Sequence, residues 1–320
     1  MPSALANTAA LLAEAATKLV WQQWGAIGAQ TSDARPHHQA ALDPEALLLM
    51  SLSLLEQERR LADVIASWVG LNSTLLSFQR ARNLSRQFPP SAQERLADVA
   101  TIALEAGDHR WKPLAAASAG TALTSRSGKL RASRPAFMQT ATLMLQLRQG
   151  MGIGVKSDVL TFLLVSDGRG QEWASVASMT RALGYTSAAV RRSADDLAAA
   201  RFIRRMETVE RETAASRMYM AEPAAWAAAL HLGTIQSGWR YWRERYSFIA
   251  DVLATSASLD AAQASDFAVA VACRELLERH RAAIIRDTGI RPALFEDSGD
   301  WPVALHAAAE QMMQWLQNNP

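Results

Sequence analysis

A short stretch near the middle of the chain carries side chains that suit contact with double-stranded DNA. Guanidinium and hydroxyl groups bind phosphate oxygens and base edges, and here two arginines lie among hydroxyl-bearing residues. Asp195 and Asp196 follow Ala194 in the same stretch, and their negative charge would repel DNA. The hydroxyl-bearing and basic side chains of the stretch are Thr186, Ser187, Arg191, Arg192 and Ser193. We predict that they face a nucleic acid.

Two predicted helices position these side chains. The first, Ser175 to Ala182, is short and amphipathic, and the second runs from Ser187 to Ala200. Between them Gly184 supplies the positive φ that a tight turn requires, and the Thr186 side chain can accept a hydrogen bond from the first free amides of the second helix. The residues expected to pack this helix are Val190, Ala194 and Leu197. The spacing therefore predicts a helix-turn-helix with one packed face and one free face.

The flanking segments are predicted to complete the same unit. Ser157 is expected to cap a preceding helix, which ends at a turn from Asp167 to Gly170. After the second helix, Phe202 to Glu207 and Ser216 to Met220 are expected to form two short strands. The polar stretch Val209 to Ala215 is then the tip of a hairpin.

The run LGYTSAAVRRSADDLAAARFIRR, from Leu183 to Arg205, resembles the DNA-binding segment of MarR-type and related winged-helix transcriptional regulators. The resemblance implies that Thr186 is the helix cap and that the exposed residues from Ser187 to Ser193 face the major groove. It implies core positions at Leu183, Val190, Leu197, Phe202 and Ile203. The residues expected to contact DNA are Thr186, Ser187, Ala188, Arg191, Arg192, Ser193, Arg205, Arg211 and Arg217, the last two as wing residues.

One position departs from the family pattern. The family commonly has a glycine where the recognition helix ends, whereas this chain has Arg201. A side chain there disfavours the left-handed conformation that closes many helices. We expect the helix to end without that cap or with backbone strain.

The chain is expected to have four parts. They are a helical domain over 1–119, a basic linker and connecting helix over 120–153, the winged helix-turn-helix over 154–222, and a helical domain over 223–320. No Asp or Glu lies between His109 and Ser157, where eight Lys and Arg residues fall. Four of these basic residues, Arg126, Lys129, Arg131 and Arg134, lie in the linker. Two interpretations remain open, a DNA-backbone arm or a soluble tether.

The flanking parts are predicted to be helical. Ala4 to Trp24 is expected to be one helix, Asp43 is expected to cap a second that reaches Arg60 or beyond, and Ser91 with Glu94 is expected to form a capping box for a third. A connecting helix is expected over Phe137 to Leu147. The later helices are expected over Ala224 to His231, Ser237 to Thr255, Ala261 to Asp287 and Pro302 to Gln317.

Several other classes of site are disfavoured. The histidines are scattered without a carboxylate partner at metal-binding spacing, and no nucleophile and base pair suggests an enzyme, so we expect no metal site, no cofactor and no catalysis. The stretch Gly150 to Lys156 lacks the spacing of a phosphate-binding loop and is interpreted as a hinge. Cys273 is expected to be a buried core thiol. No run is long and apolar enough for a membrane helix, so a soluble, cytoplasmic protein is expected.

The densest mixture of aromatic and basic side chains follows the predicted wing. Packing or dimer contact is the favoured interpretation, because Trp and Arg are common at interfaces, and an effector pocket is the alternative. The cluster comprises Trp239, Arg240, Tyr241, Trp242, Arg243, Arg245 and Tyr246.

These patterns together predict a mainly α protein with a small β-hairpin wing. Its net charge of +2 is small for a nucleic-acid binder, so the prediction depends on where the charges lie. The expected function is a DNA-binding transcriptional regulator, acting as a repressor and as a homodimer on a palindromic operator, with a small-molecule effector or a protein partner left open. The alternative is a protein-interaction module, such as an antitoxin or a scaffold, that uses the winged helix as a docking surface.

Overall fold

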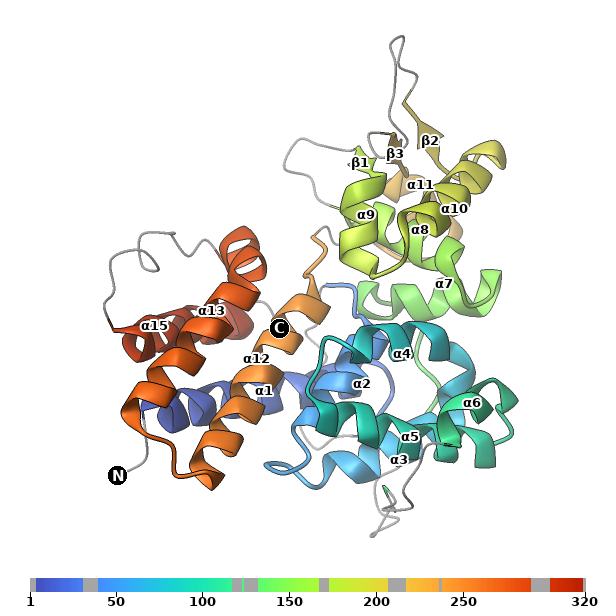
Figure 1. Cartoon of the computed structure of the whole chain (residues 1–320). Coiled ribbons are helices and arrows are strands. Elements are labelled where there is room, and N and C mark those ends of the chain that lie inside the picture. Colours follow the sequence, from blue (N-terminus) through green and yellow to red (C-terminus); the bar gives the residue numbers. More distant parts are fainter. Residues whose placement is uncertain are drawn as a thin grey trace.

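The computed structural model of the chain is mainly helical, with one small sheet (Figure 1). It describes residues 4–30, 40–116, 123, 132–166, 173–206, 217–235, 238–288 and 300–318. Within these residues, no helix is both long enough and apolar enough to cross a bilayer.

The N-terminal half is built from helices that surround a nearly fully buried one. These are α1 (Ala4–Ala26), α2 (Pro44–Ser53), α3 (Leu61–Asn72), α4 (Phe78–Ser85), α5 (Pro90–Glu105) and α6 (Lys112–Ala115), with 3-10 turns at Ser73–Leu75 and His109–Trp111. The helix α2 begins as predicted, because Asp43 Oδ1 accepts a 3.1 Å hydrogen bond from the Ala46 amide and Pro44 occupies the first turn.

Two predictions about these helices are wrong. The helix α2 ends at Ser53 rather than near Arg60, because it is buried along almost its whole length and the following Glu56 and Arg59 are exposed. Continuing the helix would carry charged side chains into the core. The capping box at Ser91 does not form, since α5 begins at Pro90 after a cap at Pro89, two residues before the predicted cap.

The C-terminal helices pack against the N-terminal ones. They are α12 (Trp242–Ala261), α13 (Asp266–Thr288) and α15 (Trp301–Asn318), and α1 contacts both α12 and α15. One continuous hydrophobic cluster joins side chains of α1 to α5 with those of α12, α13 and α15. The two ends of the chain therefore share a core. Figure 1 shows the helices of the two ends, α1 in blue and α15 in red, side by side.

A second hydrophobic cluster lies in the middle of the chain. Its elements are α7 (Leu143–Met151), α8 (Val155–Val165), β1 (Ala174–Ser175), α9 (Val176–Leu183), α10 (Ser187–Ala199), β2 (Arg204–Arg205), β3 (Met218–Met220) and α11 (Pro223–Ala229). A 3-10 turn at Thr140–Thr142 precedes α7, so the connecting helix starts later than predicted. The helix α8 starts at Val155 after Gly154, and the predicted Ser157 cap is wrong because Ser157 Oγ donates to the Gly154 carbonyl inside the first turn.

The sheet has three strands in the order β1-β3-β2, all antiparallel. Ala174 pairs with Tyr219, and Tyr219 in turn pairs with Arg205. The strand β1 was not predicted, because two residues carry no detectable alternation of apolar and polar side chains.

The aromatic cluster after the sheet is mostly core. Trp242 and Tyr246 are fully buried, where the Trp242 indole donates to the Ala41 carbonyl at 3.0 Å and the Tyr246 hydroxyl donates to Gln23 at 2.6 Å. The Arg245 guanidinium lies over the Trp315 ring, 3.1 Å from its centroid. Packing within the chain therefore accounts for this part of the cluster. Cys273 is buried as predicted.

Candidate nucleic-acid interface

The turn between α9 and α10 has the geometry that its sequence predicts. Ser175 Oγ caps α9 by accepting from the Ser178 amide at 3.1 Å, and Thr186 Oγ1 caps α10 by accepting from the Ala189 amide at 3.3 Å. Gly184 ends α9 with a φ of +74°, and its amide donates to the Thr180 carbonyl at 2.9 Å. Both helix ends are thus fixed by local hydrogen bonds and by one left-handed glycine.

The helix α10 has a packed side and an open side. Val190, Ala194 and Leu197 are buried as predicted. Ser193 is also buried, at 9% exposure, because it lies three residues beyond Val190 on the packed side. The structure therefore does not support DNA contact by Ser193. The open side begins with Thr186, Ser187 and Ala188 and continues to Arg192, while Arg191 is half-buried.

Asp195 binds several basic side chains at once. The Tyr219 hydroxyl donates to Asp195 Oδ1 at 2.7 Å, and Arg217 Nη1 donates to Oδ2 at 3.1 Å. Arg205 Nη1 lies 3.7 Å from Oδ1, and Arg191 Nη1 lies 3.8 Å from Oδ2. Burial, with the hydrogen bond to Asp195, raises the pKa of Tyr219 to about 12. One acid on α10 thus contacts arginines from α10, from β2 and from the residue before β3.

Asp196 faces a different neighbour. Its Oδ2 lies 2.8 Å from Nζ of Lys156 on α8, and both side chains are about half exposed. The two acidic residues expected to oppose DNA are therefore each paired with basic groups, which reduces the repulsion they exert.

The C-terminus of α10 adopts a strained left-handed cap. Arg201 has a φ of +62°, its amide donates to the Ala198 carbonyl at 3.0 Å, and the Phe202 amide donates to the Leu197 carbonyl at 2.9 Å. These two bonds form a Schellman motif with arginine at the position where glycine is usual. Of the two endings that the sequence left open, the structure has the strained one.

Phe202 does not occupy the core position predicted for it. Its side chain is 45% exposed and stacks edge-on against Trp226 of α11, with ring centroids 5.7 Å apart. The left-handed residue before it turns the chain outward, so Ile203 becomes the buried member of the pair. A shallow cavity of about 540 Å³ lies beside Phe202 and Trp226.

Several predicted contact residues lie outside the described residues. These are Arg211 and the linker residues Arg126, Lys129 and Arg131. Arg134 is described and exposed, and the adjacent Ser133 donates from its amide to the Gly28 carbonyl at 2.8 Å. This end of the linker therefore lies on the N-terminal helices rather than against α10.

A buried network of charged side chains, which was not predicted from the sequence, lies beneath the turn. Arg80 Nη1 contacts Asp43 Oδ1 at 2.5 Å, and Arg148 Nη1 contacts Glu45 Oε1 at 2.6 Å. Arg148 Nε lies 2.8 Å from Asp158 Oδ1, and the Tyr185 hydroxyl donates to Asp158 Oδ2 at 2.7 Å. The charged members, all with fully buried side chains, are Asp43, Glu45, Arg80, Arg148 and Asp158. A charged residue inside an apolar run, such as Asp158 in VKSDVLTFLLV, was the available signal.

The pKa values in this network follow from burial and pairing. Burial raises the pKa of Tyr185 well above its ordinary value, and the Asp158 carboxylate acts in the same direction. Burial alone would raise the pKa of Asp43, but the charge and hydrogen bonds of Arg80 outweigh it, and the pKa of Asp43 lies below its ordinary value. The network thus keeps Asp43 ionised and Tyr185 protonated near neutral pH.

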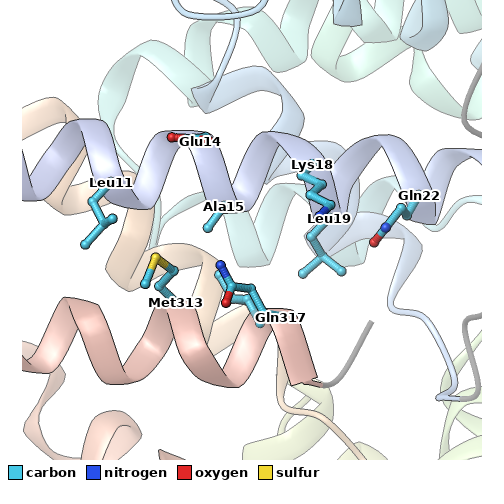
Figure 2. A pocket seen from close by; sticks show the side chains of 9 residues that line it. Leu11, Glu14, Ala15, Lys18, Leu19, Gln22, Met313 and Gln317 are labelled. Carbon is cyan, nitrogen blue, oxygen red and sulfur yellow. The ribbon is translucent and has the colours of Figure 1, made fainter.

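Two other kinds of site, a metal centre and a cavity with reactive side chains, were also considered among the described residues. Among the described residues, no group of His, Cys, Asp and Glu side chains could hold a metal ion. A cavity of about 250 Å³ lies between α1 and α15, where Leu11 and Leu19 reach toward α15 and Met313 reaches back (Figure 2). Its charged lining residues are Glu14 and Lys18, which do not form a nucleophile and base pair.

No protein-family model, curated protein or solved structure matches the chain.

Proposed function

We propose that the segment from α8 to β3 is a winged helix-turn-helix and that the protein binds double-stranded DNA as a transcriptional regulator. The observation that carries the proposal is the combination of a capped α10, exposed on one side, with two arginines that Asp195 binds: Arg205 of β2 and Arg217, the residue before β3. The element order α8, β1, α9, α10, β2, β3 and the sheet order β1-β3-β2 also suit a winged helix.

The open side of α10 suits entry into a major groove. Its first turn carries only the small side chains of Thr186, Ser187 and Ala188, so the helix can approach base edges closely. The positive end of the helix dipole lies at the same turn and favours phosphate. Arg192 lies further along the exposed side and would supply the strongest contact to a guanine or a phosphate.

Arg205 and Arg217 would contact the DNA backbone beside the groove. Both approach Asp195 through one guanidinium nitrogen, which leaves other N–H groups of each arginine for phosphate oxygens. Their side chains are partly exposed. We further propose that two copies of the chain bind a palindromic operator, since two-fold symmetry places two recognition helices in successive major grooves.

The test begins with selection of DNA from a random duplex library by the full chain. Arg192→Ala is then expected to relax discrimination at one base pair by about 1–3 kcal/mol, with wild-type folding. Arg59→Ala, at an exposed position before α3, is the matched control and should leave binding unchanged. Failure to enrich any sequence, or an Arg192→Ala variant with unchanged affinity and salt dependence, would overturn the proposal. A protein that copurifies stoichiometrically in the absence of DNA enrichment would support the protein-docking alternative instead.

A further inference from the structure

The helix α11 exposes an apolar side to solvent. A helix side that faces water usually carries charged or polar residues, whereas the exposed residues of α11 are one proline and several alanines. They are Pro223, Ala224, Ala225, Ala228 and Ala229. The buried residue of this helix, Ala227, belongs to the hydrophobic cluster that contains α8. The opposite side therefore leaves apolar area in contact with water, which is typical of an interaction surface.

Two aromatic rings extend this apolar side. Phe202 is 45% exposed, its ring meets that of Trp226 edge-on, and the Trp226 indole donates to the Phe202 carbonyl at 3.1 Å. The cavity of about 540 Å³ lies beside the two rings, and its apolar lining includes Ile203, Met220 and Ala225. The rings and the exposed side of α11 form one patch, the α11 surface, which carries both a projecting ring and a hollow.

Charges of both signs lie at one edge of the α11 surface. Arg204 Nη2 lies 3.4 Å from Glu222 Oε2, and the two side chains are 72% and 57% exposed. Both residues line the cavity, together with the exposed Arg201. Because the pair is open to solvent, each of its members can also reach an opposite charge on another molecule. A patch with both signs is complementary to itself when a two-fold axis exchanges the two positions.

The α11 surface lies on the other face of β2 from the contacts of Asp195. Successive residues of a strand point to opposite faces. Arg205 lies 3.7 Å from Asp195 of α10, whereas its neighbour Arg204 contacts Glu222, the residue before α11. A molecule bound at the α11 surface would therefore leave Arg205 available for the proposed contact with DNA.

We propose that the α11 surface binds the same surface of a second copy of the chain. Phe202 of each copy enters the cavity of the other, and Arg204 of each copy pairs with Glu222 of the other. A second copy suits this patch because the ring, the hollow and the two charges all lie on it, so that one two-fold contact satisfies each of them twice. The choice of a second copy also rests on the proposed function, in which two copies bind one operator.

Sedimentation velocity without DNA measures the association of the full chain over a range of concentrations. Wild type is expected to sediment as a dimer that dissociates on dilution. Ala225→Arg places an unpaired charge in the apolar patch and is expected to raise the dissociation constant of the dimer about a hundredfold or more. Ala10→Arg, the same change at an exposed position of α1, is the matched control and should dimerise like wild type. Thermal unfolding of both variants should match wild type, since both alanines are exposed.

Charge reversal tests the two-fold pairing itself. Arg204→Glu and Glu222→Arg each place like charges opposite one another at both symmetry-related contacts, and each is expected to weaken the dimer about tenfold or more. An equimolar mixture of the two variants is expected to restore the dimer, because each copy then meets an opposite charge at both contacts. Mixing cannot restore a contact that forms within one chain, so the mixture distinguishes the two arrangements.

Four results would overturn the inference. They are a wild type that stays monomeric at every concentration, an Ala225→Arg variant that dimerises like wild type, an equal loss in Ala10→Arg, and a mixture of the charge-reversed variants that stays dissociated. The first would leave the α11 surface to a different protein or a small ligand. DNA selection is a separate measurement: a monomer that enriches one duplex sequence keeps the proposed function without this inference, and a dimer that meets every expectation above but enriches none keeps the inference without the proposed function.

Discussion

Arg80 Nε donates a 3.0 Å hydrogen bond to the carbonyl oxygen of Leu183, a residue 103 positions later in the chain. The carbonyl belongs to the last turn of α9, where backbone acceptors lack partners within the helix. A buried arginine from the N-terminal half thus satisfies the end of the helix that leads into the proposed recognition turn. The two halves of the molecule are joined by this bond and by the charge network around it.

Arg80→Met is expected to destabilise the protein strongly. The substitution leaves the carboxylates of Asp43 and Glu45 buried with one guanidinium fewer, and removal of one partner from a buried ion pair costs about 3–5 kcal/mol. Urea unfolding followed by circular dichroism measures the change. Arg60→Met is the control, because the pair of Arg60 with Glu58 is largely exposed on the arginine side and its loss should cost less than about 1 kcal/mol. Equal effects of the two substitutions would contradict the stabilising role of the network.

Local features of the helix-turn-helix could be predicted from the sequence. Gly184 and Thr186 act on atoms within a few residues of themselves, so their types and spacing alone indicate a left-handed turn and a helix cap. The packed positions Val190, Ala194 and Leu197 follow from helical periodicity for the same reason. The predictions of these features were correct because the interactions that determine them are between residues close together in the chain.

Features set by distant contacts could not be predicted. From the sequence, Arg80 is expected to be a surface residue of a short helix. Only the approach of the start of α2, of α8 and of the turn makes it a buried ion. Phe202 was assigned to the core, whereas the left-handed Arg201 before it turns its side chain outward. Ser193 is a different case, because helical spacing from Val190 places it on the packed side and could have excluded it from the predicted contact residues.

Acid is expected to destabilise the protein partly through Asp43. Because its pKa in the folded state lies below the ordinary value of 3.8, the unfolded chain takes up this proton at higher pH than the folded chain. The contribution is fully present above the ordinary pKa and is lost as the pH falls through the lower folded value. Urea unfolding from neutral pH down to about pH 2.5 should show this decline. In Asp43→Asn, which keeps a capping side chain, the free energy of unfolding should be lower at neutral pH and fall less steeply in acid. An unchanged slope would exclude Asp43 as a source of the pH dependence.

Gly184→Ala is expected to destabilise the protein by about 2–3 kcal/mol. An L residue is unfavourable by about 1–2 kcal/mol at a left-handed position, and the new methyl group would also lie 2.7 Å from Leu84 Cδ2 and 2.9 Å from Arg243 Nη1. Gly150→Ala is the control. That glycine lies within α7 with no atom within 4 Å of a built Cβ, so alanine should stabilise by about 0.5–1 kcal/mol. Thermal unfolding of both variants gives the comparison, and loss of stability in both would argue against a special role for Gly184.

Arg201→Gly is expected to stabilise the protein by about 1 kcal/mol. Glycine adopts the left-handed conformation without the steric cost that arginine bears at a φ of +62°. The Arg201 side chain is exposed, so its removal opens no cavity. Arg201→Ala should leave stability nearly unchanged, since alanine bears the same backbone strain. Unfolding midpoints in urea distinguish the two, and a glycine variant no more stable than the alanine variant would show that the strain is absent in solution.

Asp195→Asn is expected to lower the preference for the selected duplex over an unrelated duplex. It is also expected to raise the electrostatic affinity for duplex of any sequence. Asparagine can still accept from the Tyr219 hydroxyl, but it no longer attracts Arg191, Arg205 and Arg217. One negative charge beside the proposed interface is lost, so affinity for unrelated duplex should rise, and the ratio of affinities for selected and unrelated duplex should fall about tenfold, or about 1.4 kcal/mol.

Asp196→Asn provides the matched comparison. It makes the same change of charge one residue along α10, where the acid faces Lys156 on α8 instead of the strands. Its affinity for unrelated duplex should also rise, but its specificity ratio should stay near the wild-type value, because Arg205 and Arg217 keep Asp195 as their partner. Fluorescence anisotropy with both duplexes measures both quantities. If the two variants lose specificity equally, the effect is one of net charge, and orientation of the arginines by Asp195 plays no part in DNA recognition.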